Sequence, residues 1–134
     1  MPEARETALR FVDAINRGDL ADLDRLVTSD HEFVDSDGTR TTGRQAVIEG
    51  WAAFFGMVCG YTIDATEIHR AGDVVVLVGV AKGAFEARNQ AGRRIAWEVP
   101  AAWRAVVRGD EVARWQVFVN PEPILAALQR SKQE

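Results

Sequence analysis

The spacing of apolar residues along the chain follows a helical period first and an alternating period later. Residues 3–17 are predicted to form an amphipathic helix, because their apolar positions share one face. These positions are Ala8, Phe11, Val12 and Ile15. Gly18 ends this helix, and Asp19 caps a second, shorter one. The apolar positions of the second helix are Leu20, Leu23, Leu26 and Val27.

A short strand and a third helix come next. Residues 31–35 are predicted to be a strand, which ends in the turn Ser36-Asp37-Gly38. Thr42 and Gln45 have the spacing of a capping box, in which two side chains satisfy free backbone N–H groups at a helix start. The helix that they begin is expected to bury Val47, Ile48, Trp51, Ala52 and Phe55.

From Tyr61 onward, apolar residues alternate with polar ones, which is typical of strands. Three further apolar runs follow, separated by short turn-like segments: residues 73–86, 95–107 and 111–119. Connections this short favour an antiparallel meander. Pro121 and Pro123 then introduce a last short helix at about residues 122–131.

This order of elements predicts an α+β fold, because the helices are segregated from an antiparallel sheet. We expect a cone in which a strongly curved antiparallel sheet wraps around the three N-terminal helices. The interior of the cone is expected to be largely apolar, with one open mouth. A chain of 134 residues has the size of one domain, so residues 1–134 are predicted to form a single domain.

Composition and charge exclude several classes of function. The net charge is −4 and the basic residues are scattered, which argues against nucleic-acid binding. His31 and His69 are the only histidines, and neither has a second ligand at metal-binding spacing, so we expect no metal and no cofactor. The longest apolar run, Val74 to Ala81, is too short to span a membrane. With one cysteine, Cys59, and no secretory signal, a cytoplasmic protein is expected.

Four segments of the chain are distinctive: Asn16-Arg17-Gly18-Asp19-Leu20, Phe33-Val34-Asp35, Gly43-Arg44-Gln45-Ala46-Val47 and Trp115-Gln116-Val117-Phe118. Together with the order of elements, they resemble the nuclear transport factor 2-like superfamily and, within it, the SnoaL-like group. The resemblance covers essentially the whole chain and implies the cone fold. It does not define an activity, because this fold hosts isomerases, dehydratases, epoxide hydrolases, polyketide cyclases and non-catalytic binding modules.

Asp35 is the candidate catalytic residue. By resemblance to ketosteroid isomerase, the general-base aspartate of that enzyme falls on Asp35. Its two oxyanion donors fall on Phe11 and on Ala101, or on Ala102 if the loop shifts by one, and none of these side chains can donate a hydrogen bond. Asp35 is expected to be the one buried carboxylate of the pocket, and a carboxylate that faces an apolar cavity can exchange a proton near neutral pH. The alternative interpretation is that Asp35 only caps the turn that ends at Gly38.

Limonene-epoxide hydrolase is the second enzyme that the chain resembles. Its catalytic arginine and its two aspartates would fall near Lys82, Ala84 and Val117. Only a cation remains there, and lysine does not reproduce the geometry of arginine. The resemblance therefore does not imply epoxide hydrolysis.

The remaining candidate residues are expected to bind the ligand. Two-residue alternation places Arg114, Gln116 and Phe118 on one face of the last strand, and the resemblance to ketosteroid isomerase turns this face toward the cavity. Gln116 would orient a ligand carbonyl or hydroxyl group, and Arg114 would neutralise Asp35, bind a ligand carboxylate or lie at the rim. The full candidate set is Phe11, Trp51, Phe55, Trp97, Trp103, Arg114, Gln116 and Phe118.

Two hypotheses about function follow. The first is a proton-transfer enzyme of the isomerase, cyclase or dehydratase type, which acts on an apolar carbonyl or polyketide-like compound with Asp35 as the base. The second is a non-catalytic module that binds a small apolar ligand or serves as a scaffold. A homodimer is expected in both cases, because residues 74–80 are apolar on both faces and the superfamily usually covers the outer face with a second subunit.

Overall fold

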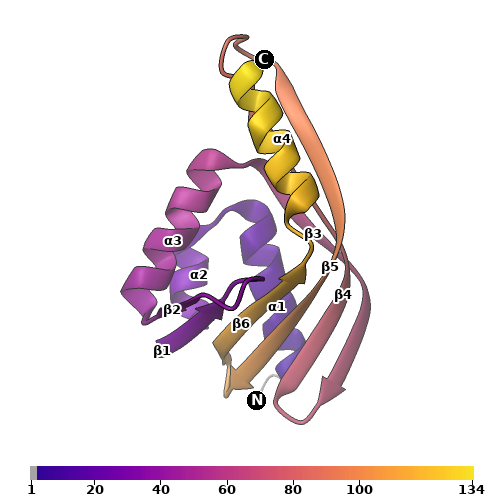
Figure 1. The fold of residues 1–134 in the computed structure, drawn as a ribbon. Coiled ribbons are helices and arrows are strands. Elements are labelled where there is room, and N and C mark those ends of the chain that lie inside the picture. Colours follow the sequence, from indigo (N-terminus) through magenta and orange to yellow (C-terminus); the bar gives the residue numbers. More distant parts are fainter. Residues whose placement is uncertain (1–2) are drawn as a thin grey trace.

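The structure, a computed structural model, describes residues 3–134. Within these residues, four helices and one six-stranded sheet form a tapering molecule (Figure 1). The helices are α1 (Ala4–Arg17), α2 (Leu20–Leu26), α3 (Arg44–Met57) and α4 (Glu122–Gln133). The strands are β1 (Val27–Val34), β2 (Arg40–Thr42), β3 (Cys59–Ala71), β4 (Val74–Glu86), β5 (Arg94–Arg108) and β6 (Glu111–Val119).

The sheet has the strand order β2-β1-β6-β5-β4-β3. Strands β3 to β6 form the predicted antiparallel meander. The sheet as a whole is mixed, because β1 runs parallel to β6. The short strand β2, which pairs with β1, was not predicted, and β1 begins four residues earlier than expected. The α+β fold with a curved sheet is confirmed.

Side chains from the helices fill the concave side of the sheet. The central helix α1 contributes Phe11 and Ile15, which are almost completely buried. Phe11 packs on Trp115 of β6, with 4.8 Å between ring centroids. Helices α1, α2 and α3 lie together on this side, whereas α4 runs along the far ends of β4 and β5 (Figure 1). The base of the cone is therefore solid core.

The ends of the first three helices test the predicted caps. Gly18 follows α1 in the left-handed conformation, with a φ of 62°, and Asp19 Oδ1 accepts a hydrogen bond from the Asp22 N–H at 3.0 Å. Both predictions are confirmed. The capping box at Thr42 and Gln45 is wrong, because Gly43 is the N-cap of α3 and no side chain caps this helix. None of the helices in residues 3–134 is long and apolar enough to cross a membrane.

His31 is a fully buried polar residue that joins β1 to β6. Its Nδ1–H donates to the carbonyl of Val112 at 2.6 Å, and its Nε2 has no hydrogen-bond partner among the described residues. Burial lowers the pKa of the imidazole, because the charged form loses its hydration. The folded state therefore holds this histidine neutral.

We predict that His31 makes the protein less stable in mild acid. The unfolded chain takes up a proton near pH 6.5 and the folded chain does so only at lower pH, so stability is constant above pH 6.5 and falls below it. The free energy of unfolding should fall by up to about 1.4 kcal/mol between pH 7.5 and 5.5. Urea unfolding at the two pH values measures this change.

The substitution His31→Gln should remove most of this pH dependence, whatever its effect on stability itself. His69→Gln is the matched control, because the His69 side chain is 68% exposed. An unchanged pH dependence in His31→Gln would show that another group is responsible.

Candidate functional site

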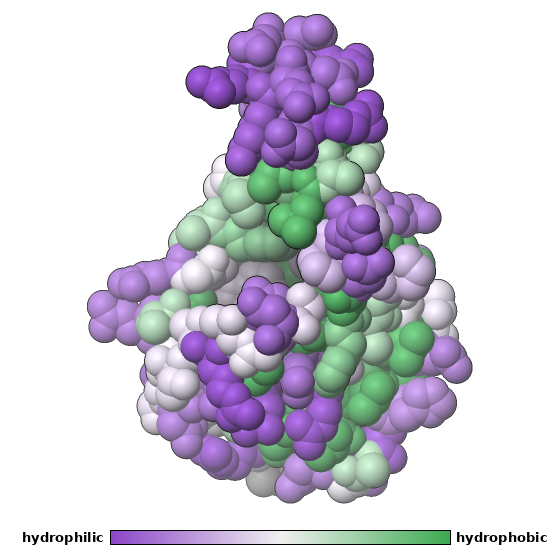
Figure 2. Space-filling view, viewed as in Figure 1, coloured by the Kyte–Doolittle hydropathy of each residue, from purple (hydrophilic) through white to green (hydrophobic). Residues whose placement is uncertain are grey.

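A cavity of about 320 Å³ lies between α3 and the concave face of the sheet. Ile124, in the first turn of α4, contributes to its wall. Figure 2 shows apolar residues gathered here, below the polar tip formed by the far end of α4. Small residues leave this space empty, because Ala81 and Ala101 occupy adjacent strands where larger side chains would fill it.

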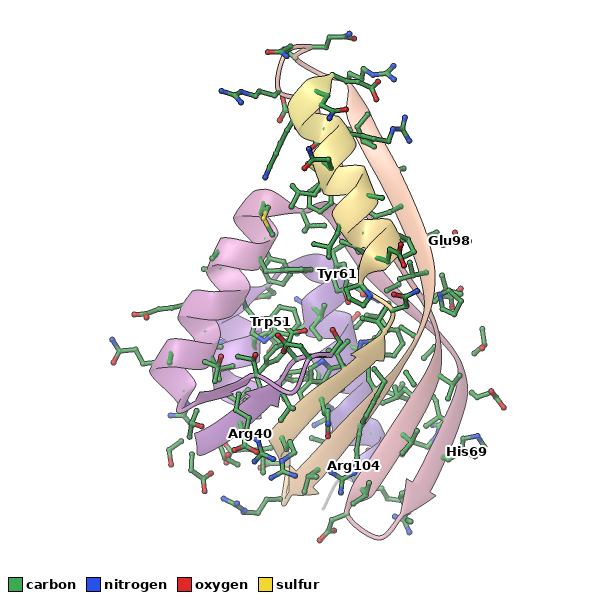
Figure 3. The ribbon with its side chains drawn as sticks, in the orientation of Figure 1. Arg40, Trp51, Tyr61, His69, Glu98 and Arg104 are labelled. Atoms are coloured by element: carbon green, nitrogen blue, oxygen red, sulfur yellow. The ribbon has the colours of Figure 1, made fainter. Side chains whose placement is uncertain are left out.

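Six aromatic residues line the cavity: Phe33, Trp51, Phe54, Tyr61, Trp97 and Trp103. Neighbouring rings meet edge to face, at 82° between Phe33 and Trp51 and at 90° between Phe54 and Tyr61. Such pairs are favoured because the positive edge of one ring meets the negative face of the next. The rings therefore turn corners around the cavity and do not stack in one plane. Trp51 and Tyr61 point from α3 and β3 into the same interior region (Figure 3).

Gly83 of β4 positions the Trp97 indole. The two residues are direct partners across β4 and β5. A Cβ atom on Gly83 would lie 2.5 Å from Trp97 Cζ2 and 2.7 Å from a methyl group of Val58. Because real Cβ contacts are never this short, any other residue here would displace the indole. The glycine thus helps to set the depth of the cavity.

Tyr61 was not predicted as a site residue, yet it lines the cavity and brings a phenol hydroxyl group to the wall. A bulge between Cys59 and Thr62 adds one residue to β3, and Gly60 in this bulge has a φ of 59°. Both Cys59 and Thr62 then pair with outward-facing positions of β4, and Tyr61 turns inward. Burial raises the pKa of the Tyr61 phenol to about 12, and the negative charge of Asp35 adds to the rise.

Asp35 lines the mouth of the cavity but is exposed, so the expectation of a buried carboxylate is wrong. Its Oδ1 accepts a hydrogen bond from the Ser36 N–H at 2.7 Å, and its carbonyl accepts one from the Gly38 N–H at 2.9 Å. Asp35 therefore makes the turn contacts that the alternative interpretation assigned to it. Its Oδ2 makes no hydrogen bond within residues 3–134 and remains able to accept a proton.

The last strand faces the opposite way from the one expected. Val117 pairs with the buried Trp103 and Gln116 pairs with Arg104, so Val117 and Val119 line the cavity. Gln116, Arg114 and Phe118 lie on the outer face, and Phe118 is 48% exposed. The physical reason is burial: Trp115, Val117 and Val119 form the apolar set of this strand, and the larger apolar face packs inward.

Arg114 makes an ion pair with Glu32 at 2.8 Å and does not pair with Asp35. Two aromatic candidates also lie outside the cavity wall. Phe11 is fully buried in the core beneath it, and Phe55 packs against Trp51 with 5.5 Å between ring centroids. The structure thus brings four of the predicted site residues together around the cavity: Asp35, Trp51, Trp97 and Trp103.

The described residues offer no obvious metal site. No group of three or more His, Cys, Asp or Glu side chains within residues 3–134 is placed to hold a metal ion. The cavity has instead a carboxylate at its mouth, a phenol in its inner wall and the hydroxyl-bearing Thr41. The carboxylate can accept a proton at one end of the cavity, and the phenol can donate a hydrogen bond at the other.

Residues 8–115 match the family model of the SnoaL-like domain. Because this match covers most of the chain, the protein belongs to the SnoaL-like family. No curated protein matches the chain.

Many solved structures share the fold. One from Shewanella denitrificans, described as a candidate SnoaL-like polyketide cyclase, has a TM-score of 0.83 and 16% identity, and the match covers 96% of this chain and 98% of that one. IdmH from Streptomyces antibioticus, also described as a candidate polyketide cyclase, has a TM-score of 0.79 and 20% identity, and the match covers 96% of this chain and 99% of that one. A Catenulispora acidiphila protein with a ketosteroid isomerase-like fold, in complex with trimethylamine, has a TM-score of 0.78 and 24% identity, with 91% of each chain covered.

We predict that Gly83→Ala destabilises the protein and disturbs the cavity, because the added methyl group overlaps the Trp97 indole. Overpacking of this kind should lower the free energy of unfolding by about 1–3 kcal/mol. Urea unfolding followed by tryptophan fluorescence measures both the stability and the environment of the indole.

Gly50→Ala is the matched control for this substitution. Gly50 also lines the cavity, lies within α3 and has no atom within 4 Å of an added Cβ. This control should raise stability by about 0.5–1 kcal/mol, because alanine favours a helix over glycine. Equal stability of the two variants would contradict the assigned role of Gly83.

Proposed function

We propose that the protein binds a small, mostly apolar carbonyl compound in the cavity and moves a proton on it. The observation that carries this proposal is the placement of Asp35 and Tyr61 on one aromatic-walled cavity. Sites for small organic molecules are typically apolar with a few convergent polar groups. The description of two relatives as polyketide cyclases, and the trimethylamine held by a third, support a small-molecule site in this fold.

Asp35 is proposed as the base. Its Oδ2 is available, and its Oδ1 is held in place by the turn. A carboxylate is a far weaker base than the enolate that it would generate, so the substrate must be one that loses a proton easily. A carbon flanked by two carbonyl groups, or by a carbonyl group and an aromatic ring, meets this requirement. The substrate class is therefore an activated, enolisable ketone, as in polyketide-like compounds.

Tyr61 is proposed to stabilise the enolate that forms. With a pKa of about 12, its phenol remains protonated at neutral pH and can donate a hydrogen bond to the developing oxyanion. This donor replaces the ones missing at Phe11 of α1 and Ala101 of β5, and it comes from β3. Burial of the phenol strengthens the hydrogen bond, because little water competes for it.

We predict that the protein accelerates exchange of the α-protons of 2-tetralone with deuterium in buffered D₂O. Asp35→Asn should abolish the acceleration, and Tyr61→Phe should reduce it about 10²–10³-fold, as expected for loss of one oxyanion donor. Proton NMR measures the exchange. Asp37→Asn is the matched control, because it removes a carboxylate from the same turn at a residue that does not line the cavity.

Binding is measured separately by tryptophan fluorescence, since three tryptophans line the cavity. If 2-tetralone binds and its protons exchange no faster than in buffer, the non-catalytic binding module becomes the better account. If neither 2-tetralone nor related ketones bind, the proposal of a small-molecule site is wrong.

We also propose that the protein is a homodimer formed through the outer face of the sheet. Val76 and Val78 of β4 are only half-buried there, beside Ala102 of β5. We predict a dimer in sedimentation velocity at micromolar concentration, with an interface above about 1,000 Å² in total. Val78→Lys should yield monomers, whereas Gln129→Lys on the exposed face of α4 should not. A monomeric parent protein would contradict this proposal.

A further inference from the structure

The wall of the cavity carries a single charge, and this charge is negative. Asp35 is the single charged residue among those that line it, within the part of the chain that the structure describes. The chain has 16 lysines and arginines, yet none of them contributes to this wall. An anionic ligand would meet the carboxylate with no compensating cation, so the wall disfavours negatively charged compounds.

The nearby arginines are engaged elsewhere. Arg114, which was expected to neutralise Asp35, pairs with Glu32 at 2.8 Å, and Arg40 pairs with the same carboxylate at 3.2 Å. No ion pair to Asp35 exists in residues 3–134. The carboxylate at the mouth therefore keeps its charge available to a ligand.

The aromatic rings add a second source of negative potential. Three of the four tryptophans of the chain and its single tyrosine line the cavity. The face of each ring carries partial negative charge, and tryptophan attracts cations most strongly. The pairs Phe33–Trp51, Trp51–Phe54 and Phe54–Tyr61 are nearly perpendicular, so these aromatic residues wall the cavity from different directions.

We propose that the ligand of this cavity carries an alkylated, positively charged nitrogen, as in a tertiary amine or a quaternary ammonium compound. Aromatic boxes select such groups because the alkyl surface is apolar while the charge is spread over it. This inference rests on the proposed function, since it names the class of ligand for the same site. A cationic nitrogen beside a carbonyl group also makes the adjacent C–H more acidic, which suits the weak base at Asp35.

The test compares two molecules of the same shape that differ in charge. Benzyltrimethylammonium is the cation, and neopentylbenzene is its neutral carbon isostere. Titration into the protein, followed by tryptophan fluorescence, should show at least about tenfold tighter binding of the cation. Asp35→Asn should reduce this preference several-fold. Asp37→Asn should leave it unchanged, because Asp37 does not line the cavity.

A variant of the wall separates the ring contribution from the carboxylate contribution. Phe33→Leu keeps an apolar, half-buried side chain and removes one ring face, so it should weaken the cation more than the isostere. Equal affinity of the parent protein for the two molecules would overturn the inference and leave the proposed function standing. If neither molecule binds and 2-tetralone does not bind, both proposals fail.

Discussion

Strands β3, β4 and β5 are much longer than the helices that cover them, and the cavity results from this difference. The 15 residues of β5 extend over about 50 Å, whereas the 14 residues of α1 extend over about 21 Å. Near the base, Phe11 and Trp115 fill the concavity completely. Beyond them the sheet continues without a central helix. Helix α4 covers the far end, where the Arg88 N–H donates to the Ser131 carbonyl at 2.7 Å. The cavity lies between these two packed regions.

The wall of the cavity depends on residue size more than on polarity. Alanines at positions 81 and 101 leave space between the larger Trp97 and Trp103 on the same concave face. Gly83 then allows the Trp97 indole to lie against the backbone of β4. Because protein interiors are normally filled to crystal-like density, an empty volume with such walls requires several small residues acting together. The same residues would have to change if the site were to accept a larger ligand.

The sequence allowed the elements of the fold to be predicted closely, because periodicity and turn residues are local properties. Strands β4, β5 and β6 begin and end within one residue of their expected bounds. The site was predicted less well. The outward orientation of Gln116 was not predicted, because the resemblance to ketosteroid isomerase turned its face of β6 toward the cavity. The apolar set Trp115, Val117 and Val119 already indicated the opposite orientation. The exposure of Asp35 depends on a loop whose geometry no local pattern specifies. The inward turn of Tyr61, in contrast, follows from its two-residue alternation with the buried Ile63, a signal that was not recognised as a site signal.

This division between scaffold and site explains why membership of the SnoaL-like family does not define an activity. The polar groups of the cavity lie on a turn and on a bulged strand, where they can change without loss of the cone. The ion pairs of Glu32 with Arg40 and Arg114 contribute little to stability, since all three are partly exposed. Their larger effect is electrostatic, because they hold two positive charges beside a carboxylate on the outer face. The mouth of the cavity then carries the charge of Asp35 alone, and this charge constrains which ligands can enter.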